Sequence, residues 1–279
     1  MKRLPLLIAG AACTMGSACA GEGGFSYVMS LGWQDFRYEE KSSGLGLRSL
    51  ARSGGPVLVA GGLYELANGH QFSLDNESTF YPGRGSEHWH STGPVFGGVT
   101  LTDRELQRNG FSLRQSSTHI RGHYRLAEGW YASGGVALRT QSFKRYSFII
   151  GPDSAVNLPA GATIEETTSE AVATLGGAYD SGPLRGQDVH YGFRATLGAP
   201  FWRRVENTSQ PQALFSGIQG WEFSLEGRYS RAVIANVHLG VWGQWHQIVR
   251  RTQTLGSKLE LPASTLRSWA GGLELLWKL

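Results

Sequence analysis

The sequence predicts an all-β fold, a transmembrane antiparallel up-and-down β-barrel of about ten strands. Two observations predict strands of this kind. Segments of alternating apolar and polar residues recur between turns, and tryptophan and tyrosine gather near the segment ends, as they do at lipid–water interfaces. A third removes the helical alternative, because no apolar run after residue 20 reaches the roughly 18 residues of a spanning helix. Only helices and closed barrels satisfy their backbone hydrogen bonds in lipid, so a barrel remains.

The first twenty residues, "MKRLPLLIAGAACTMGSACA", have the layout of a cleaved secretory signal: a basic start, an apolar run and a small-x-small ending. An uncleaved anchor is disfavoured because Gly10, Thr14 and Gly16 interrupt the run, and a lipoprotein signal usually has Leu three residues before its cysteine. The predicted organisation is a signal peptide over 1–20 and a barrel over 21–279. Both cysteines, Cys13 and Cys19, leave with the signal, so the barrel is expected to hold together without disulfides.

The charge balance excludes a strongly basic protein. The chain has 26 Lys and Arg against 22 Asp and Glu, a net +4, and removal of the signal takes away two of the positive charges. Such a small excess forms no basic patch, so nucleic acid is not an expected partner.

The strands follow in order, and we expect them at 25–40, 47–66, 70–81, a segment ending at 126, 130–148, 168–179, 189–204, 221–229, 236–253 and 265–279. Long connections near 82–100, 149–167, 205–220 and 254–264 alternate with short turns such as Ala67-Asn68-Gly69. An even number of strands places both chain ends on one side, with short periplasmic turns and long outer loops.

The last segment, "SWAGGLELLWKL", shows the alternation most clearly. Charge is absent from one face and present on the other at Glu274 and Lys278; the uncharged face consists of Trp269, Gly271, Leu273, Leu275, Trp277 and Leu279. The first strand likewise turns Phe25, Tyr27, Met29, Leu31 and Trp33 to one side. These faces are expected to meet lipid. The expected interface aromatics are Trp33, Trp130, Trp221, Trp277, Tyr131 and Tyr229. A soluble sandwich or barrel is the alternative, since its strands also alternate but turn the apolar side inward.

With the signal, the hairpins and the terminal "GLELLWKL", the chain resembles bacterial outer-membrane β-barrel proteins. The resemblance implies location in the bacterial cell outer membrane and contact with outer-membrane lipid and lipopolysaccharide. It also implies recognition by the barrel-assembly machinery through the terminal residues Leu275, Trp277 and Leu279; members commonly end in Phe or Trp, and this chain ends in Leu. In outline it is similar to the omptin proteases, but their acidic pair and Asp–His couple have no counterpart that the sequence identifies.

Other motifs carry little chemistry. Glu87-His88-Trp89-His90 could share a metal ion if its loop curled, but a solvated loop without metal is the preferred interpretation. Ser116, Ser117 and His119 alternate poorly onto one face for a Ser–His hydrolase. No cofactor is expected, because the Gly-x-Gly pairs do not open a helix after a strand.

A distributed set of charged positions is expected to line the lumen: Asp75, Glu77, Arg121, His123, Arg139, Arg194, Glu226, Arg228, His238, His246 and Glu274. Gln244 is expected beside them. Charges inside a narrow barrel need partners, so ion pairs that fill the lumen are the preferred interpretation and a solute path is the alternative. The predicted function is that of a monomeric, non-enzymatic barrel with a structural or surface-interaction role. A narrow porin-like channel and a hydrolase with a site at the extracellular rim are the alternatives.

Overall fold

The structure is a computed structural model that describes residues 24–42, 46–95, 99–152, 161–181, 188–255 and 259–279. Its strands are β1 (Gly24–Ser42), β2 (Leu47–Glu65), β3 (Gln71–Thr79), β4 (Gly85–Val95), β5 (Val99–Ala127), β6 (Trp130–Ile150), β7 (Thr163–Asp180), β8 (Val189–Asn207), β9 (Gly220–Ile234), β10 (Val237–Arg250), β11 (Gln253–Leu255), β12 (Leu259–Leu261) and β13 (Ala263–Lys278). The predicted signal peptide and its cleavage lie outside the described residues. Among the described residues, no helix is long and apolar enough to cross a membrane.

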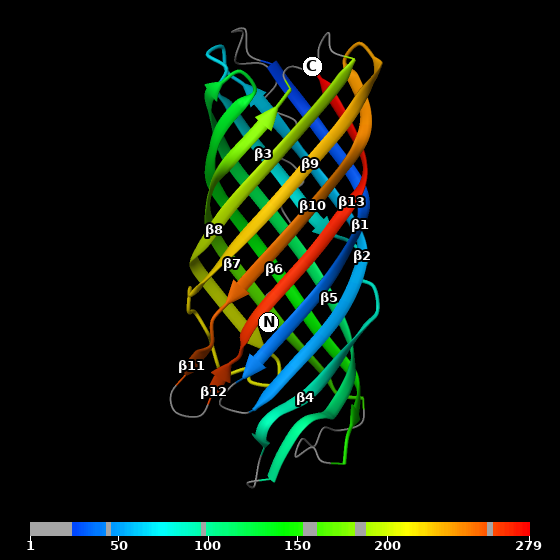
Figure 1. Cartoon of the computed structure of the whole chain (residues 1–279), viewed down its shortest axis with the longest axis vertical. Coiled ribbons are helices and arrows are strands. Elements are labelled where there is room, and N and C mark those ends of the chain that lie inside the picture. The colour runs from blue at the N-terminus through cyan, green and yellow to red at the C-terminus, as the bar shows by residue number, and fades with distance from the viewer. Residues whose placement is uncertain (1–23, 43–45, 96–98, 153–160, 182–187, 256–258) are drawn as a thin grey trace.

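The strands form one closed antiparallel ring, shown in Figure 1. Closure comes from β1, which pairs with β2 on one side and with β13 on the other, from Ser26↔Lys278 to Lys41↔Ala263. Because β3 and β4 both lie between β2 and β5, they share one place, and the ring has ten positions. The sequence-based prediction of an all-β barrel of about ten strands is confirmed.

Both ends of the described chain lie at the same end of the barrel, which we call the inner end. There the amide of Leu279 donates to the carbonyl of Phe25 at 3.0 Å, and the short turns after β2, β5 and β9 lie beside it. The opposite, outer end carries β4, β11, β12 and the long connections; it is the lower end in Figure 1. Short turns on the side of the termini match the topology of outer-membrane barrels.

The predicted long connection at 82–100 is wrong, since most of it is strand. After β3 the wall breaks at Pro82, which has no amide to donate. The amide of Gly83 donates to Gly54 O at 2.6 Å, and a Cβ on Gly83 would lie 2.1 Å from that oxygen. The chain then resumes as β4 in the same position of the ring. The turn residues therefore mark a break within one wall position and not the start of a loop.

Lipid-facing and lumen-facing residues alternate as predicted in the inner half of the wall. Met29, Leu31 and Trp33 are exposed on the outside, while Ser30 and Gln34 are buried inside. The same apolar belt continues around the barrel at Leu74, Leu138, Leu175, Leu197, Leu239, Val241 and Leu273. Such a belt is what a membrane barrel presents to acyl chains.

Aromatic side chains border the belt on both sides. Toward the inner end Tyr27 stacks on Trp277 with ring centroids 5.1 Å apart, and Tyr179 lies 5.0 Å from Trp130. Toward the outer end Trp245 packs against Trp269 at 6.0 Å. Among the predicted interface aromatics, Tyr131 is a correction: its ring is buried inside the barrel, and its hydroxyl accepts a hydrogen bond from Gln71 at 3.2 Å.

Beyond the outer aromatic row the two faces exchange character. In β1 the residues that follow Trp33 turn Phe36 and Tyr38 inward, where they are 3% and 5% exposed, and Arg37 outward. Eight inward residues from six strands form an apolar cluster here, namely Phe36, Tyr38, Ala51, Phe111, Leu113, Phe143, Ile248 and Leu266. A strand needs about 9–11 residues to cross a bilayer, and β5 has 29. The outer half therefore stands beyond the membrane as a water-soluble barrel with its own core.

Candidate functional site: the layered lumen

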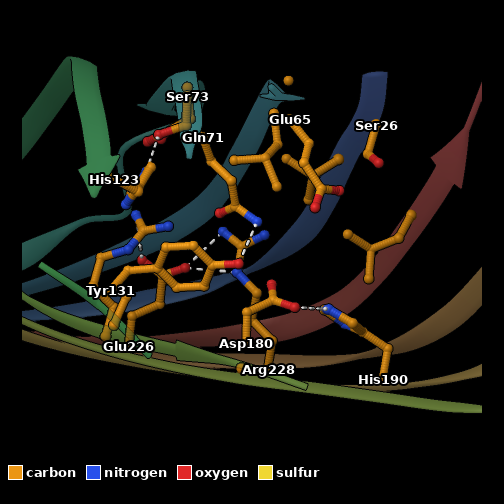
Figure 2. A pocket seen from close by; sticks show the side chains of 18 of the residues that line it. Ser26, Glu65, Gln71, Ser73, His123, Tyr131, Asp180, His190, Glu226 and Arg228 are labelled. Atoms are coloured by element: carbon orange, nitrogen blue, oxygen red, sulfur yellow. Dashed lines mark hydrogen bonds and ion pairs between the residues drawn. The ribbon is translucent and has the colours of Figure 1, made fainter. Parts of the chain in front are cut away.

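The innermost layer of the lumen surrounds a cavity of about 120 Å³, shown in Figure 2. Arg121 Nη1 contacts Asp75 Oδ1 at 2.6 Å, and Arg228 bridges Glu226 at 2.6 Å and Glu274 at 3.2 Å. These five residues were predicted to line the lumen, and the structure places them inside it, as one pair and one group of three.

The other predicted residues of this layer also face the interior. The pair Ser73 Oγ and His123 Nε2 lies 2.9 Å apart. Arg194 Nη1 lies 3.6 Å from Glu226 Oε2, and the ring of His238 meets that of His190 edge-on at 6.4 Å. His190, which the sequence-based prediction omitted, pairs with Asp180 at 3.2 Å. The inner mouth is therefore polar and contains both signs of charge.

The central layer is a network of five charged residues. Arg139 donates from both terminal nitrogens to the Glu222 carboxylate, at 2.6 and 3.1 Å. Arg203 lies 3.1 Å from Glu170, and Arg250 donates to Glu170 and also approaches Glu222 at 3.5 Å. Each of these residues is at most 6% exposed. Charges buried this deeply persist when each has an opposite partner.

Two further predicted residues lie beside the network. His246 Nε2 is 3.8 Å from Glu222. Glu77 accepts a hydrogen bond from Gln34 at 3.1 Å, so its partner is an amide and not one of the predicted arginines. Gln244 follows the inward parity of β10 and is partly buried.

Sequence reasoning missed most partners of Arg139. Glu170 and Glu222 alternate with residues that face out, which is the signal that could have found them. Arg203 was harder to assign because β8 carries a bulge at Phe201, where Ala171 pairs with Trp202 but Val172 with Pro200. The bulge changes the inward parity from even, as at Arg194, to odd, as at Arg203.

The apolar cluster of Phe36, Tyr38 and their six neighbours lies on the outer side of the central layer. Tyr38 and Phe143 rings pack with centroids 4.7 Å apart, and Tyr38 and Phe111 at 6.1 Å. The cavity beneath the cluster, between Gln141 and Arg203, measures about 20 Å³, which is close to the space of one water molecule. The cluster and the charged residues that line this cavity together leave little open space between the polar lumen and the outer end.

A second charged cluster lies on the outer side of the apolar layer and beyond the membrane belt. Arg145 contacts Glu40 at 3.0 Å and Glu87 at 2.8 Å. Burial opposes ionisation of Glu87, but Arg145 and the hydrogen bonds from Asn109 and Ser49 keep its pKa below the ordinary value. Burial, together with the charge of Glu40, raises the pKa of Glu166 to about 6.

The motif Glu87-His88-Trp89-His90 lies on β4 and not in a loop, which corrects the prediction. Glu87 is fully buried inside the barrel, whereas His88 pairs with Glu105 at 3.4 Å and His90 with Asp103 at 3.7 Å, at partly exposed positions. The carboxylate and the two imidazoles therefore do not converge. Across the described ranges no group of three His, Cys, Asp or Glu could hold a metal ion.

Comparison with solved structures identifies the fold. The outer membrane protease OmpT from Escherichia coli superposes with a TM-score of 0.62 over 92% of this chain and 97% of that chain, at 11% identity. The chain has the fold of a bacterial outer-membrane β-barrel. With the apolar belt around it, this fold locates the barrel in the bacterial outer membrane. At such low identity the similarity to the protease shows the fold alone.

More distant matches do not refine this result. The outer membrane protein OprG from Pseudomonas aeruginosa matches at a TM-score of 0.37, 9% identity and 93% and 98% coverage of the two chains. The translocator domain of the autotransporter NalP from Neisseria meningitidis matches at 0.36, 10% identity and 92% and 88% coverage. Both scores are too low to support an argument. No family model and no curated protein matches the sequence.

Proposed function

We propose that the barrel is a sealed, non-conducting outer-membrane protein whose role is structural or interaction-bearing at the cell surface. The observation that carries the proposal is the succession of layers across the lumen. The central Arg139 network and the apolar cluster around Phe111 both lie across the bore. The space left beside the apolar cluster is lined also by Glu166, Thr168 and Arg203 and holds about one water molecule. A hydrated ion would therefore have to shed its water to pass. A porin-like channel is the less supported alternative for that reason.

The surface role is supported by the outer half. Its wall stands beyond the belt with charged side chains turned outward, at Arg37, Glu39, Lys144, Glu165 and Arg204. A second apolar cluster, Val205, Ala213, Phe215 and Leu261, anchors the connection before β9 to β12 at the outer end. Loops held on a rigid scaffold are where binding surfaces usually lie.

Ion flux through proteoliposomes tests the proposal with matched variants. Replacing Phe111, Phe143 and Arg139 by alanine removes the apolar layer and the central tie, so flux should rise. The control, Leu138→Ala, changes the adjacent, lipid-facing residue and should leave flux at the wild-type level. Folding of each variant is checked by heat-dependent migration on SDS gels. High wild-type flux, or no rise in a folded triple variant, would contradict the sealed-lumen proposal.

The terminal residues support a further part of the proposal, recognition by the barrel-assembly machinery. Trp277 stacks on Tyr27 at the inner border of the belt, and Leu279 is exposed at that end. Trp277→Ser should therefore reduce the amount of folded protein in cells more than Trp269→Ser, at the outer border. Equal amounts for the two variants would count against recognition through the terminus. Lipopolysaccharide contact and a monomeric state belong to the same proposal.

A second candidate function, ester hydrolysis, is favoured by one contact. Ser73 Oγ and His123 Nε2 are in hydrogen-bonding distance at 2.9 Å and both line the inner cavity. A serine beside a neutral imidazole can be activated as a nucleophile. Turnover of p-nitrophenyl acetate by the wild type that Ser73→Ala and His123→Ala each abolish, while Ser133→Ala does not, would support this role.

A further inference from the structure

The outward-facing surface of the wall carries a groove next to the outer aromatic row, on the side toward the outer end. The groove crosses β13, β1, β2 and the break between β3 and β4. It has a volume of about 700 Å³, and its lining includes four arginines, Arg37, Arg52, Arg84 and Arg267, all exposed. One carboxylate, Asp35, shares the lining, and it accepts a hydrogen bond from Trp33 Nε1 at 3.2 Å. Strands β13, β1 and β2 are neighbours in the ring (Figure 1).

Three of the arginines form a row through the sheet. Arg37 of β1 lies directly opposite Arg267 of β13 on one side and directly opposite Arg52 of β2 on the other. Cβ atoms of directly opposed residues are about 4.5–5.5 Å apart, and like charges in such pairs destabilise a sheet. A row of three in register therefore needs a counter-charge.

The described residues do not supply that counter-charge. No ion pair joins Arg37, Arg52, Arg84 or Arg267 to a carboxylate in the described part of the chain, and Arg267 instead donates to Gln247 at 3.1 Å. Elsewhere on the outer wall the pattern is different. Arg48 pairs with Glu39 at 2.9 Å, Arg108 with Glu105 at 2.9 Å, and Arg204 pairs with Glu206.

The height of the row points to the ligand. Arg267 lies two positions before Trp269 on the same face of β13, a step of about 7 Å along the strand, and Trp269 belongs to the aromatic row that borders the belt. The polar headgroup layer of one leaflet is about 5–7 Å deep. The guanidinium groups therefore lie at the level of the lipid headgroups, on the outer side of the side chains that meet the acyl chains.

We propose that this groove binds the phosphate groups of an outer-leaflet lipid whose acyl chains lie against the apolar belt. Arginine matches phosphate oxygens with paired N–H donors, and two phosphates would neutralise the row. The occupant is a lipid and not a free anion because the groove reaches Trp269 of the outer aromatic row, which borders the belt. The proposal rests on the lipopolysaccharide contact of the proposed function, for which it names the site, and is independent of whether the lumen conducts.

The test counts bound lipid by native mass spectrometry. The folded full-length mature barrel in neutral detergent is mixed with diphosphorylated lipid A, or with the same lipid after removal of its phosphates. The test variant is Arg37→Gln/Arg52→Gln/Arg267→Gln. The control variant, Arg48→Gln/Arg108→Gln/Arg204→Gln, makes the same change of charge at arginines that have a glutamate partner.

The proposal expects wild-type and control barrels to bind the diphosphorylated lipid within about twofold of each other, and the test variant at least tenfold more weakly. Equal loss in the control would attribute binding to net charge and overturn the site. Equal binding of the dephosphorylated lipid would overturn the phosphate assignment. Displacement of the lipid by millimolar inorganic phosphate would assign the groove to a free anion and overturn the lipid.

A second measurement, of the unfolding temperature, predicts a gain for the test variant where the binding experiment predicts a loss. In neutral detergent without lipid, the test variant should unfold at a higher temperature than the wild type, because the substitutions remove like-charge repulsion. Addition of the diphosphorylated lipid should raise the unfolding temperature of the wild type and leave that of the variant unchanged. A variant that unfolds at a lower temperature without lipid would show that the arginines stabilise the wall by themselves, and would overturn the proposal.

Discussion

Arg139 of β6 holds Glu222 of β9 across the lumen with two hydrogen bonds, at 2.6 and 3.1 Å. The two strands are separated in the ring by β7 and β8, so the pair ties wall segments that share no backbone hydrogen bond. Arg139 Nε also donates a hydrogen bond to Ser117 Oγ at 3.2 Å. The pair thereby links three parts of the wall at the level of the outer border of the belt.

Removal of one partner from this pair should be costly. Glu222→Ala leaves Arg139 buried with the more distant Glu170, and an uncompensated buried charge costs about 3–5 kcal/mol. Replacing both together, as Arg139→Met/Glu222→Leu, should cost clearly less. The measurement is the free energy of unfolding in urea, followed by tryptophan fluorescence. A double variant as unstable as Glu222→Ala would show that volume, and not charge pairing, matters at this position.

The lipid-facing belt predicts a depth-dependent response to charge. Leu273 lies midway between Trp269 and Trp277 on β13 and is 64% exposed, so Leu273→Arg should lower stability by about 2–4 kcal/mol. Thr265→Arg, on the same face of the strand but beyond the outer aromatic row, should change stability by less than about 1 kcal/mol. Refolding into lipid vesicles measures both, and similar losses would mean that the belt is misplaced.

The structure changes what we expect at Glu274. From the sequence, an inward neutral replacement there is expected to be milder than a charge on the lipid face. Glu274 in fact accepts from Ser30 at 3.0 Å and pairs with Arg228 at 3.2 Å. Glu274→Gln should therefore also destabilise, by about 1–3 kcal/mol, because it weakens a buried charge-assisted contact. Unfolding in urea at pH 7 measures this, and a neutral effect would show that Glu226 alone satisfies Arg228.

Stability in the outer half should depend on pH through Glu166. Its pKa is raised to about 6 by burial and by the charge of Glu40, so the folded state binds a proton more tightly than the unfolded state does. This carboxyl therefore stabilises the fold when protonated, and the contribution is lost as pH rises from about 4.5 through 6. Relative to Glu166→Gln, the wild type should gain on the order of 1–2 kcal/mol between pH 7 and pH 5.

Urea titrations of the two proteins at both pH values measure that difference. Glu87 works in the opposite direction, since its lowered pKa favours the ionised form, but it contributes equally to both proteins and cancels. A wild type that loses stability relative to Glu166→Gln on acidification would contradict the raised pKa.

The sequence was sufficient for the barrel because the belt repeats a period of two in nearly every strand. Met29, Leu31 and Trp33 reveal their face without any knowledge of neighbours. The apolar core of the outer half was not predicted because it inverts that rule within single strands. In β1 the odd-numbered residues face outward throughout, and the apolar side chains occupy these outward positions up to Trp33. Beyond Trp33 the apolar side chains, Phe36 and Tyr38, occupy the inward positions instead. A search for one continuous lipid face therefore ends at Trp33.

The sequence predicts which charged side chains face the lumen better than it predicts which of them pair with one another. Parity places Arg139 and Arg194 inside, but which acid each meets depends on the register of strands that are not adjacent. The bulge at Phe201 adds a shift that alternation alone does not reveal. The break at Pro82 similarly has the local sequence of a loop, and only pairing with β2 and β5 shows that β4 continues the wall.

The central claim is that the lumen is sealed, and the current through wild-type barrels in a planar bilayer tests it most directly. With insertion verified by the heat-dependent gel shift of the same preparation, we expect little or no steady current. Brief openings at high voltage would be compatible with local movement of side chains. A large, stable and reproducible single-channel conductance would contradict the account and would make the barrel a porin-like channel.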